Sequence, residues 1–368
     1  MKKFFKKSTA FVPVWSAVLF ALFFCSLIVN GMIKNHPAFA QTIHRTVGAA
    51  MRAVMSTLTS WIPFSLAEIL LILSPVLLFL VCFFMTRRLR RSLTAGIRYF
   101  VGFLSVTSLV FTILVFGYNA SFYGEKIETT IGLERNDLAP EQLYDTAILL
   151  IDAIREDIPD VYYPEGSYSE MRFSYSEMNR KLNEAYQAFC ERYPSFQHLY
   201  TNTKPVMLSE PWTYTHISGM YTFFTGEANV NTNYPDFIMI SSAAHEMAHQ
   251  RGIGKEDEAN FVAFLVCSLS DDPYIRYSGY ADVLNELMGK LSSADAELHR
   301  KAYEYMPQEL RNEYTAYSVF FDKYRENVAA TVSTTVNNAY ITSHNQPQGV
   351  KSYGLVVDLV AAYMLNEK

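Results

Sequence analysis

The chain has 368 residues, half of them hydrophobic, and its 31 Lys and Arg against 36 Asp and Glu give a formal net charge of −5 at pH 7. That length is enough for a membrane portion followed by one soluble domain with its own core. Because no long basic run lies outside the membrane flanks, we exclude nucleic acid as a partner.

Three apolar runs before residue 120 are long enough to cross a bilayer, which takes about 20 residues of helix. They cover roughly 11–30, 63–85 and 99–118. The first run resembles a secretory signal, since four lysines precede it and "AFA" (38–40) follows. Its apolar core is longer than that of a signal, so we interpret it as an uncleaved span. The sequence therefore predicts a membrane domain over 1–119 and a second domain over 120–368.

Positive charges predict the orientation of these spans. The N-terminal lysines and the four arginines between 87 and 91 flank the first two spans on the same side, which the positive-inside rule assigns to the cytoplasm. We therefore expect a multi-pass protein of the cell membrane, with its N-terminus in the cytoplasm and residues 120–368 outside it. The segment 34–62 carries apolar residues at helical spacing, which predicts an amphipathic helix along the outer surface of the lipid bilayer: Val47, Met51, Val54, Met55 and Leu58.

The second domain has mostly helical periodicity. Between about 204 and 231 the pattern changes to short β-branched and aromatic stretches broken by glycines, which predicts two or three strands. We expect helices at about 141–158, 176–193, 241–251, 255–269, 273–291, 307–342 and 350–365. The predicted fold class is α+β, mostly helical, with a small sheet beside the helices. Cys190 and Cys267 fall in this domain, either as a disulfide or as buried free thiols.

The sequence "HEMAHQRG" (245–252) contains two histidines four residues apart. On a helix, His245 and His249 lie one above the other, so both rings can bind one Zn²⁺. Glu246 is turned so that its carboxylate can act as a general base on a water beside the metal without being a ligand. The alternative interpretation is a helix whose histidines have only a structural role or face solvent.

A catalytic zinc needs a third protein ligand, and "GIGKEDEANF" (252–261) offers acidic candidates on the next helix. Gly252 and Gly254 can turn the chain back toward the histidines. We choose Glu256 as the third ligand, with Glu258, on a different helical face, as the alternative. Asn260 shares a face with Glu256, so we expect its side chain to hydrogen-bond a ligating imidazole or carboxylate.

The pattern H-E-x-x-H followed by E-x-x-A-N resembles the glutamate-zincin metallopeptidases. The resemblance implies that His245, His249 and Glu256 bind zinc, that Glu246 is the general base and that Asn260 supports the ligands. This chain has Asn where many members have Asp, and its His249-to-Glu256 spacing is shorter than in thermolysin-like enzymes.

A resemblance over nearly the full length is to the bacterial membrane family catalogued as domain of unknown function 3810 (DUF3810). It rests on the three spans and on "TGEANVN" (225–231), "HEMAHQRGI", "EDEANF", "RYSGY" (276–280) and "GVKSYG" (349–354). This resemblance implies a membrane-anchored zinc peptidase with an extracytoplasmic zincin-like domain and an unassigned substrate.

Peptide hydrolysis also needs a donor that stabilises the oxyanion of the reaction. The candidates are Tyr340, His344, Tyr353 and Arg276, each with packing or ion pairing as its alternative role. We choose Tyr353 as a catalytic residue, because "GVKSYG" places it between glycines at the head of the last helix.

The stretch "TGEANVN" precedes the histidine helix. We interpret it either as an edge strand along the cleft, where an extended peptide could pair, or as a hairpin that supports the helix. Asn229 and Asn231 would face the same side of this strand. Glu227 is interpreted as a partner of the ligands or as a surface charge.

Together these patterns predict a membrane-anchored zinc metallopeptidase that cleaves peptides or proteins near the outer membrane surface. The alternative is a catalytically weak or inactive zinc-binding membrane sensor. A structural envelope protein whose histidines bind nothing is a third, weaker possibility.

Overall fold

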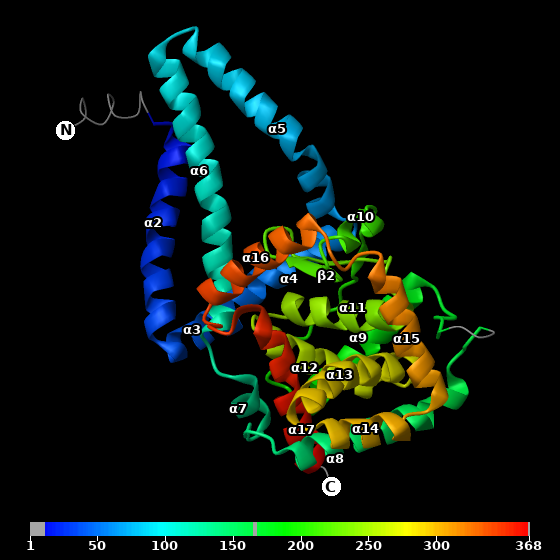
Figure 1. Ribbon diagram of the computed structural model, residues 1–368. Helices are drawn as coiled ribbons and strands as arrows, with labels where there is room; N and C mark the ends of the chain where they lie inside the picture. The colour runs from blue at the N-terminus through cyan, green and yellow to red at the C-terminus, as the bar shows by residue number, and fades with distance from the viewer. Residues whose placement is uncertain (1–11, 165–167, 367–368) are drawn as a thin grey trace.

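A computed structural model describes residues 12–164 and 168–366 of the chain. Figure 1 shows three long helices projecting from one side of a helical domain. The four N-terminal lysines used for the orientation lie outside the described residues.

The three long helices are α2 (Val14–Asn35), α5 (Leu66–Leu89) and α6 (Leu93–Gly117). Within the described residues, these three are long and apolar enough to cross a membrane, which agrees with the three predicted apolar helices. The third begins at Leu93 rather than at 99, because Ser92 caps it by accepting a hydrogen bond from the Ala95 backbone N–H at 3.1 Å. In Figure 1, α2 lies along α6, whereas α5 leans away from both toward the domain.

The segment between the first two spans is helical, as predicted. It consists of α3 (Pro37–Ile43), a π-helical turn η1 (His44–Gly48) and α4 (Ala49–Ser60). Arg52 and Ser56 of α4 are buried against the rest of the protein, while Val54 and Leu58 are exposed. The polar side of α4 thus packs inward and its apolar side faces outward, as expected for a helix at a membrane boundary.

Two carboxylates join the base of span α5 to the domain. Glu227 accepts hydrogen bonds from the first two backbone N–H groups of α5, at 3.1 and 2.9 Å, and pairs with Lys204 at 2.7 Å. In the other direction, Glu68 of α5 accepts from the backbone N–H groups of Met207 and Leu208, both at 2.8 Å. Glu227 is therefore not a surface charge: it is buried, and its charge is used at the N-terminus of the long apolar helix α5.

The domain follows α6. Its helical elements are η2 (Asn119–Phe122), α7 (Ile127–Ile131), α8 (Pro140–Asp157), η3 (Ile158–Asp160), α9 (Tyr175–Arg192), α10 (Ser209–Thr213), α11 (Asp236–Gln250), α12 (Glu256–Ser268), α13 (Pro273–Ala294), α14 (Ala296–Tyr305), α15 (Gln308–Asp322), α16 (Val328–Ser343), η4 (Gly349–Leu355) and α17 (Val356–Asn366). Helices α8, α11, α12 and α13 enclose the main core, in which Phe237, Phe261 and Leu284 are fully buried. Cys190 and Cys267 are buried free thiols.

The single helix predicted over 307–342 is two helices, α15 and α16. The break comes from Asn327, whose side chain accepts a hydrogen bond from the Ala330 N–H at 2.8 Å and so starts a new helix. Helix α14 was not predicted, and Asp295 caps it in the same way by accepting from the N–H groups of Glu297 and Leu298.

A small three-stranded sheet lies beside α11. Its strands, in the order β1-β3-β2, are β1 (Lys204–Pro205), β3 (Glu227–Val230) and β2 (Gly219–Thr222). Strand β1 runs parallel to β3, and β2 runs antiparallel to it. Because β3 is buried in the middle, the interpretation of "TGEANVN" as an edge strand is wrong, and β2 occupies the edge instead. Asn229 and Asn231 are both buried: Asn229 hydrogen-bonds Thr222 across the hairpin at 2.7 Å, and Asn231 donates to Thr213 at 3.1 Å.

Candidate metal centre

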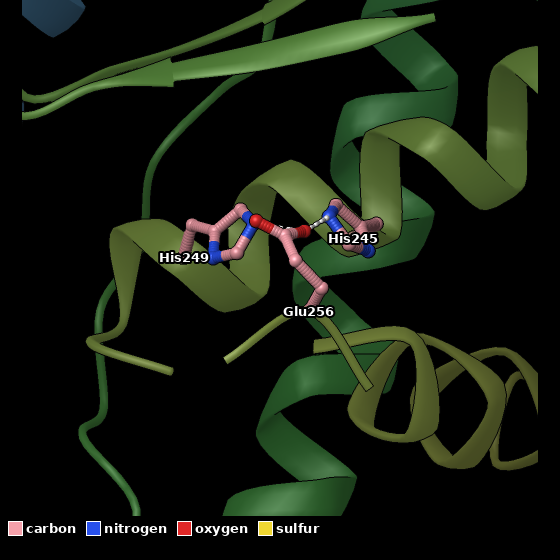
Figure 2. A group of neighbouring side chains, drawn as sticks. All are labelled: His245, His249 and Glu256. Atoms are coloured by element: carbon pink, nitrogen blue, oxygen red, sulfur yellow. Dashed lines mark ion pairs between the residues drawn. The ribbon is translucent and has the colours of Figure 1, made fainter. Parts of the chain in front are cut away.

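Three side chains from α11 and α12 converge on one point. The Nε2 atoms of His245 and His249 lie 3.3 and 3.4 Å from Oε2 of Glu256. Figure 2 shows the Glu256 carboxylate between the two imidazoles. One potential ligand atom from each residue lies within 4.8 Å of the other two, close enough for all three to hold a single metal ion.

A glycine turn brings Glu256 to the histidines. Helix α11 ends at Gln250, and Gly252 follows with φ of 96°, a conformation that side chains other than glycine rarely adopt. A Cβ atom at Gly252 would also lie 2.5 Å from the Arg52 guanidinium of α4. The chain can therefore reverse within a few residues, and Glu256 becomes the first residue of α12.

The structure separates the two candidate third ligands. Glu256 lies between the imidazoles, whereas Glu258 accepts hydrogen bonds from Lys255 at 2.7 Å and from the Ile127 backbone N–H at 3.4 Å. Both carboxylates are buried. Only Glu256 is brought to the histidines, as the helical spacing predicted.

The polar atoms at this point fit a metal ion. Among the described residues, Oε2 of Glu246 and Oε2 of Glu256 are buried without a hydrogen-bond partner. Buried polar atoms in proteins nearly always have a partner, so two unpaired carboxylate oxygens beside the histidines fit a site for a cation. Two imidazole nitrogens and one carboxylate oxygen form a donor set that suits Zn²⁺.

The ring of His249 is held in the tautomer that metal binding requires. Its Nδ1–H donates to the Ile253 carbonyl oxygen at 2.7 Å, and the Tyr118 hydroxyl oxygen lies 2.9 Å from the same nitrogen. Because Nδ1 keeps its proton on the Ile253 carbonyl, Nε2 is the nitrogen that faces Glu256, and it becomes available to a metal when it releases its own proton. Because Tyr118 ends the third span, the membrane domain directly contacts a candidate ligand.

A second buried carboxylate is close enough to His245 for their charges to interact. Asp282 of α13 is buried and accepts a hydrogen bond from the Ser241 hydroxyl at 2.5 Å. Burial raises the pKa of Asp282, although the Ser241 hydrogen bond and the nearby His245 lower it. Asp282 and Tyr118 could not be found from the sequence, because nothing local links them to His245 and His249, which lie 37 and 131 residues away from them.

The Glu246 carboxylate lies beside the two histidines and against strand β2. A Cβ atom at Gly219 would come within 2.6 Å of Glu246, so β2 can approach this closely only because residue 219 is glycine. Burial and the charge of Glu256 raise the pKa of Glu246, while the two histidines and a backbone hydrogen bond from Tyr221 lower it. The net shift is upward, which brings this carboxylate closer to the range useful for proton transfer near neutral pH.

Comparison with known protein families places the chain. The family described as "Protein of unknown function (DUF3810)" matches residues 44–361, which include both helices of the candidate centre. The chain belongs to the DUF3810 family. Searches of curated proteins and of solved structures found no match.

In this DUF3810 protein, Tyr353 lies at the candidate centre, as expected. Its ring stacks near that of His245, with the centroids 6.4 Å apart. Burial and the charge of Glu256 raise the pKa of Tyr353 well above its usual value, so the hydroxyl keeps its proton. Asn260 does not contact the ligands through any hydrogen bond among the described residues, because its amide donates to the Tyr353 carbonyl oxygen at 3.5 Å. Asn260 thus supports the segment that carries Tyr353 rather than the ligands themselves.

The other three oxyanion candidates have different positions. Tyr340 of α16 is close enough to Glu256 that the carboxylate raises its pKa, in addition to the effect of burial. His344 stacks on Phe122, with ring centroids 4.8 Å apart, and its Nδ1 bonds the Tyr340 carbonyl oxygen at 2.7 Å. Arg276 is paired with Asp157, the ion-pairing role that was its alternative. Of the four candidates, Tyr353 and Tyr340 are the two whose side chains interact with Glu256.

Proposed function

We propose that this DUF3810 protein is a membrane-anchored zinc-dependent peptidase. The convergence of His245, His249 and Glu256, with the carboxylate of Glu246 beside them, is the observation that carries the proposal. A three-ligand set leaves a coordination position open, which distinguishes catalytic zinc sites from closed structural ones.

Zinc held by these three side chains would polarise a peptide carbonyl and make a nearby water more acidic. Glu246 accepts a proton from the attacking water as the new C–O bond forms, since its Oε2 has no other hydrogen-bond partner among the described residues. Glu246 then gives that proton to the amine nitrogen as the C–N bond breaks. The Tyr353 hydroxyl, kept protonated by its surroundings, can donate a hydrogen bond to the oxyanion.

The proposed substrates are peptides or proteins near the membrane surface. Tyr118, the residue that directly follows α6, contacts His249, so the end of α6 lies next to the candidate centre. The centre therefore lies close to the membrane boundary of the third span. The positive charges that flank the first two spans favour the extracytoplasmic side for the domain.

The experiment compares three forms of the full-length protein in nanodiscs: the wild type, His245→Ala and Glu246→Gln. We expect one zinc per chain in the wild type, loss of zinc in His245→Ala, and retained zinc in Glu246→Gln. Incubation with a peptide library and mass spectrometry of the products measures cleavage, which should occur with the wild type alone. Absence of zinc from the purified wild type, or equal cleavage by Glu246→Gln, would refute the proposal.

A second candidate function is a zinc-binding membrane sensor with little turnover. The contact between Tyr118, at the end of span α6, and His249 favours it, because a change at the metal could be transmitted directly to a membrane helix. The two variants also separate these functions in cells. If Glu246→Gln leaves the cellular phenotype intact while His245→Ala abolishes it, the protein is a sensor.

A further inference from the structure

Helix α16 is unusual for a helix on the surface of a domain, because none of its 16 residues is charged. On its outward face, Val328, Val332 and Val336 are 80, 57 and 64% exposed. Valine and threonine, which make up much of this helix, are also weak helix formers in water. An exposed helix of this composition is more typical of an apolar environment than of an aqueous one.

Four hydroxyl groups of α16 are already paired with the backbone of their own helix. Thr331, Thr335, Thr342 and Ser343 each donate to a backbone carbonyl oxygen three or four residues earlier, at 3.3, 2.8, 2.8 and 2.7 Å. Hydroxyl groups bonded back to their own helix are the arrangement that lets Ser and Thr face lipid. The outward face of α16 therefore combines exposed valines with polar groups that are already paired.

The two ends of α16 lie close to the ends of two spans. At its C-terminal end, His344 stacks on Phe122 in η2, which follows α6. Just before its N-terminal end, Tyr324 packs on Tyr214 after α10, with ring centroids 4.9 Å apart. The segment that enters α10 is bonded to Glu68 of span α5. Figure 1 shows α16 lying across the domain at the level of α4, where the spans meet it.

We propose that the outward face of α16 lies in the lipid bilayer interface, on the side of the membrane where the domain sits. There it would extend the apolar surface formed by Val54 and Leu58 of α4 and by Trp61, which is 86% exposed. Lipid is the occupant that fits, because α16 lies at the level of α4 in Figure 1, where the three helices that are long and apolar enough to cross a membrane meet the domain. A helix far from the spans in sequence is thus a further membrane-contacting element.

The opposite face of α16 lies against the candidate metal centre. Asn337 donates to the Tyr353 hydroxyl at 3.5 Å, and the Tyr340 side chain lies near Glu256. One wall of the centre is therefore a helix whose other side touches the bilayer. Contact of α16 with lipid does not depend on peptide hydrolysis, and the experiment below measures no enzymatic activity.

The experiment uses the full-length protein in nanodiscs. Cys25 and Cys82, the exposed native cysteines, are replaced by Ser, and a fluorophore is attached at Val328→Cys, Val332→Cys or Val336→Cys. The matched control is Tyr303→Cys on α14, which is 45% exposed and lies at the end of the domain away from the spans in Figure 1. Quenching by lipids brominated in the upper acyl chain reports contact with the bilayer, and quenching by iodide reports contact with water.

We expect lipid quenching at the three α16 positions to exceed that at residue 303 several-fold, with iodide quenching reduced by a similar factor. Equal values at α16 and at residue 303 would overturn the inference. Protection from iodide without quenching by lipid would mean that a second copy of the chain or another protein covers α16, and would overturn it as well.

Discussion

The sharpest test of the candidate centre compares two glutamates that are two residues apart on the same helix. Glu256→Gln and Glu258→Gln make the same chemical change at two buried carboxylates. Only Glu256 lies within 3.3 to 3.4 Å of the histidine nitrogens, while Glu258 is paired with Lys255. We expect the first variant to lose zinc and the second to keep it.

The size of the effect follows from the geometry. Removing a residue that only supports a ligand weakens metal binding about 10- to 100-fold, so loss of a ligand should cost at least about 100-fold. A unit positive charge at the position of His245 Nε2, 3.3 Å from Glu256 Oε2, would interact with that carboxylate by about 5 kcal/mol at an effective dielectric constant of about 20, which corresponds to nearly 10⁴-fold and sets the upper end of the expected loss. We therefore expect the zinc dissociation constant of Glu256→Gln to rise between about 10² and 10⁴-fold. Glu258→Gln should change it less than about threefold but lower the free energy of unfolding by about 1.5–3 kcal/mol, through loss of its charged hydrogen bond.

Competition with a fluorescent zinc chelator measures the dissociation constants of both variants and of the wild type in nanodiscs. Thermal unfolding in the presence of excess chelator measures the stability of the same samples. Unchanged affinity in Glu256→Gln, or a large loss of affinity in Glu258→Gln alone, would refute the assignment of the third ligand.

Three further predictions concern the surroundings of the ligands. Gly219→Ala places a Cβ atom 2.6 Å from Glu246, so the Glu246 carboxylate must move by about 1 Å. We expect this variant to cleave peptides about 100-fold more slowly while it retains one zinc per chain. Full activity would contradict this geometry. Asp282→Asn should weaken zinc binding, measured by chelator competition, by less than the roughly 10- to 100-fold expected of a residue that hydrogen-bonds a ligand, because Asp282 acts on His245 through its charge alone; unchanged affinity would exclude this role. Burial lowers the pKa of His249, but neighbouring carboxylates and a backbone carbonyl raise it to about 9. Because the pKa of His249 in the folded protein lies above the unfolded value of about 6.5, its protonated ring should stabilise the zinc-free protein below pH 6.5, and this stabilisation should be lost as the pH rises through 9. Zinc affinity should increase over the same pH range, because the metal competes with that proton. Melting temperatures measured with and without zinc should therefore diverge as the pH rises, and a constant difference between them would contradict the prediction.

Local sequence patterns were sufficient to predict those parts of the structure that are formed by residues close together in the chain. The spans follow from runs of about 20 apolar residues, which the bilayer thickness requires. His245, His249 and Glu256 lie within 12 residues of chain, so helical spacing and one glycine turn predict that they meet. The same reasoning chose Glu256 over Glu258, in agreement with the arrangement of the side chains.

The sequence was less informative where strands and helix ends depend on distant partners. Strand β3 was interpreted as a possible edge, yet it is central because β1, more than 20 residues earlier, pairs with its other side. The break between α15 and α16 depends on the Asn327 side chain, which caps the start of α16. The spacing of apolar residues gives no sign of such a cap. Asn260 was expected to support the ligands, but the packing of η4 on α12 places the Tyr353 carbonyl within its reach instead.

What the sequence by itself determined is therefore the three long apolar helices, the mostly helical architecture with a small sheet, and the three convergent side chains, because each is encoded by residues close together in the chain. Only the tertiary structure decided how these parts are joined. Tyr118 meets His249 across 131 residues, and Glu227 caps the membrane helix that begins 161 residues before it. Such contacts depend on how whole helices pack against one another. A side chain whose partner is far away in the sequence does not belong to any local periodic pattern, so the sequence alone does not identify it.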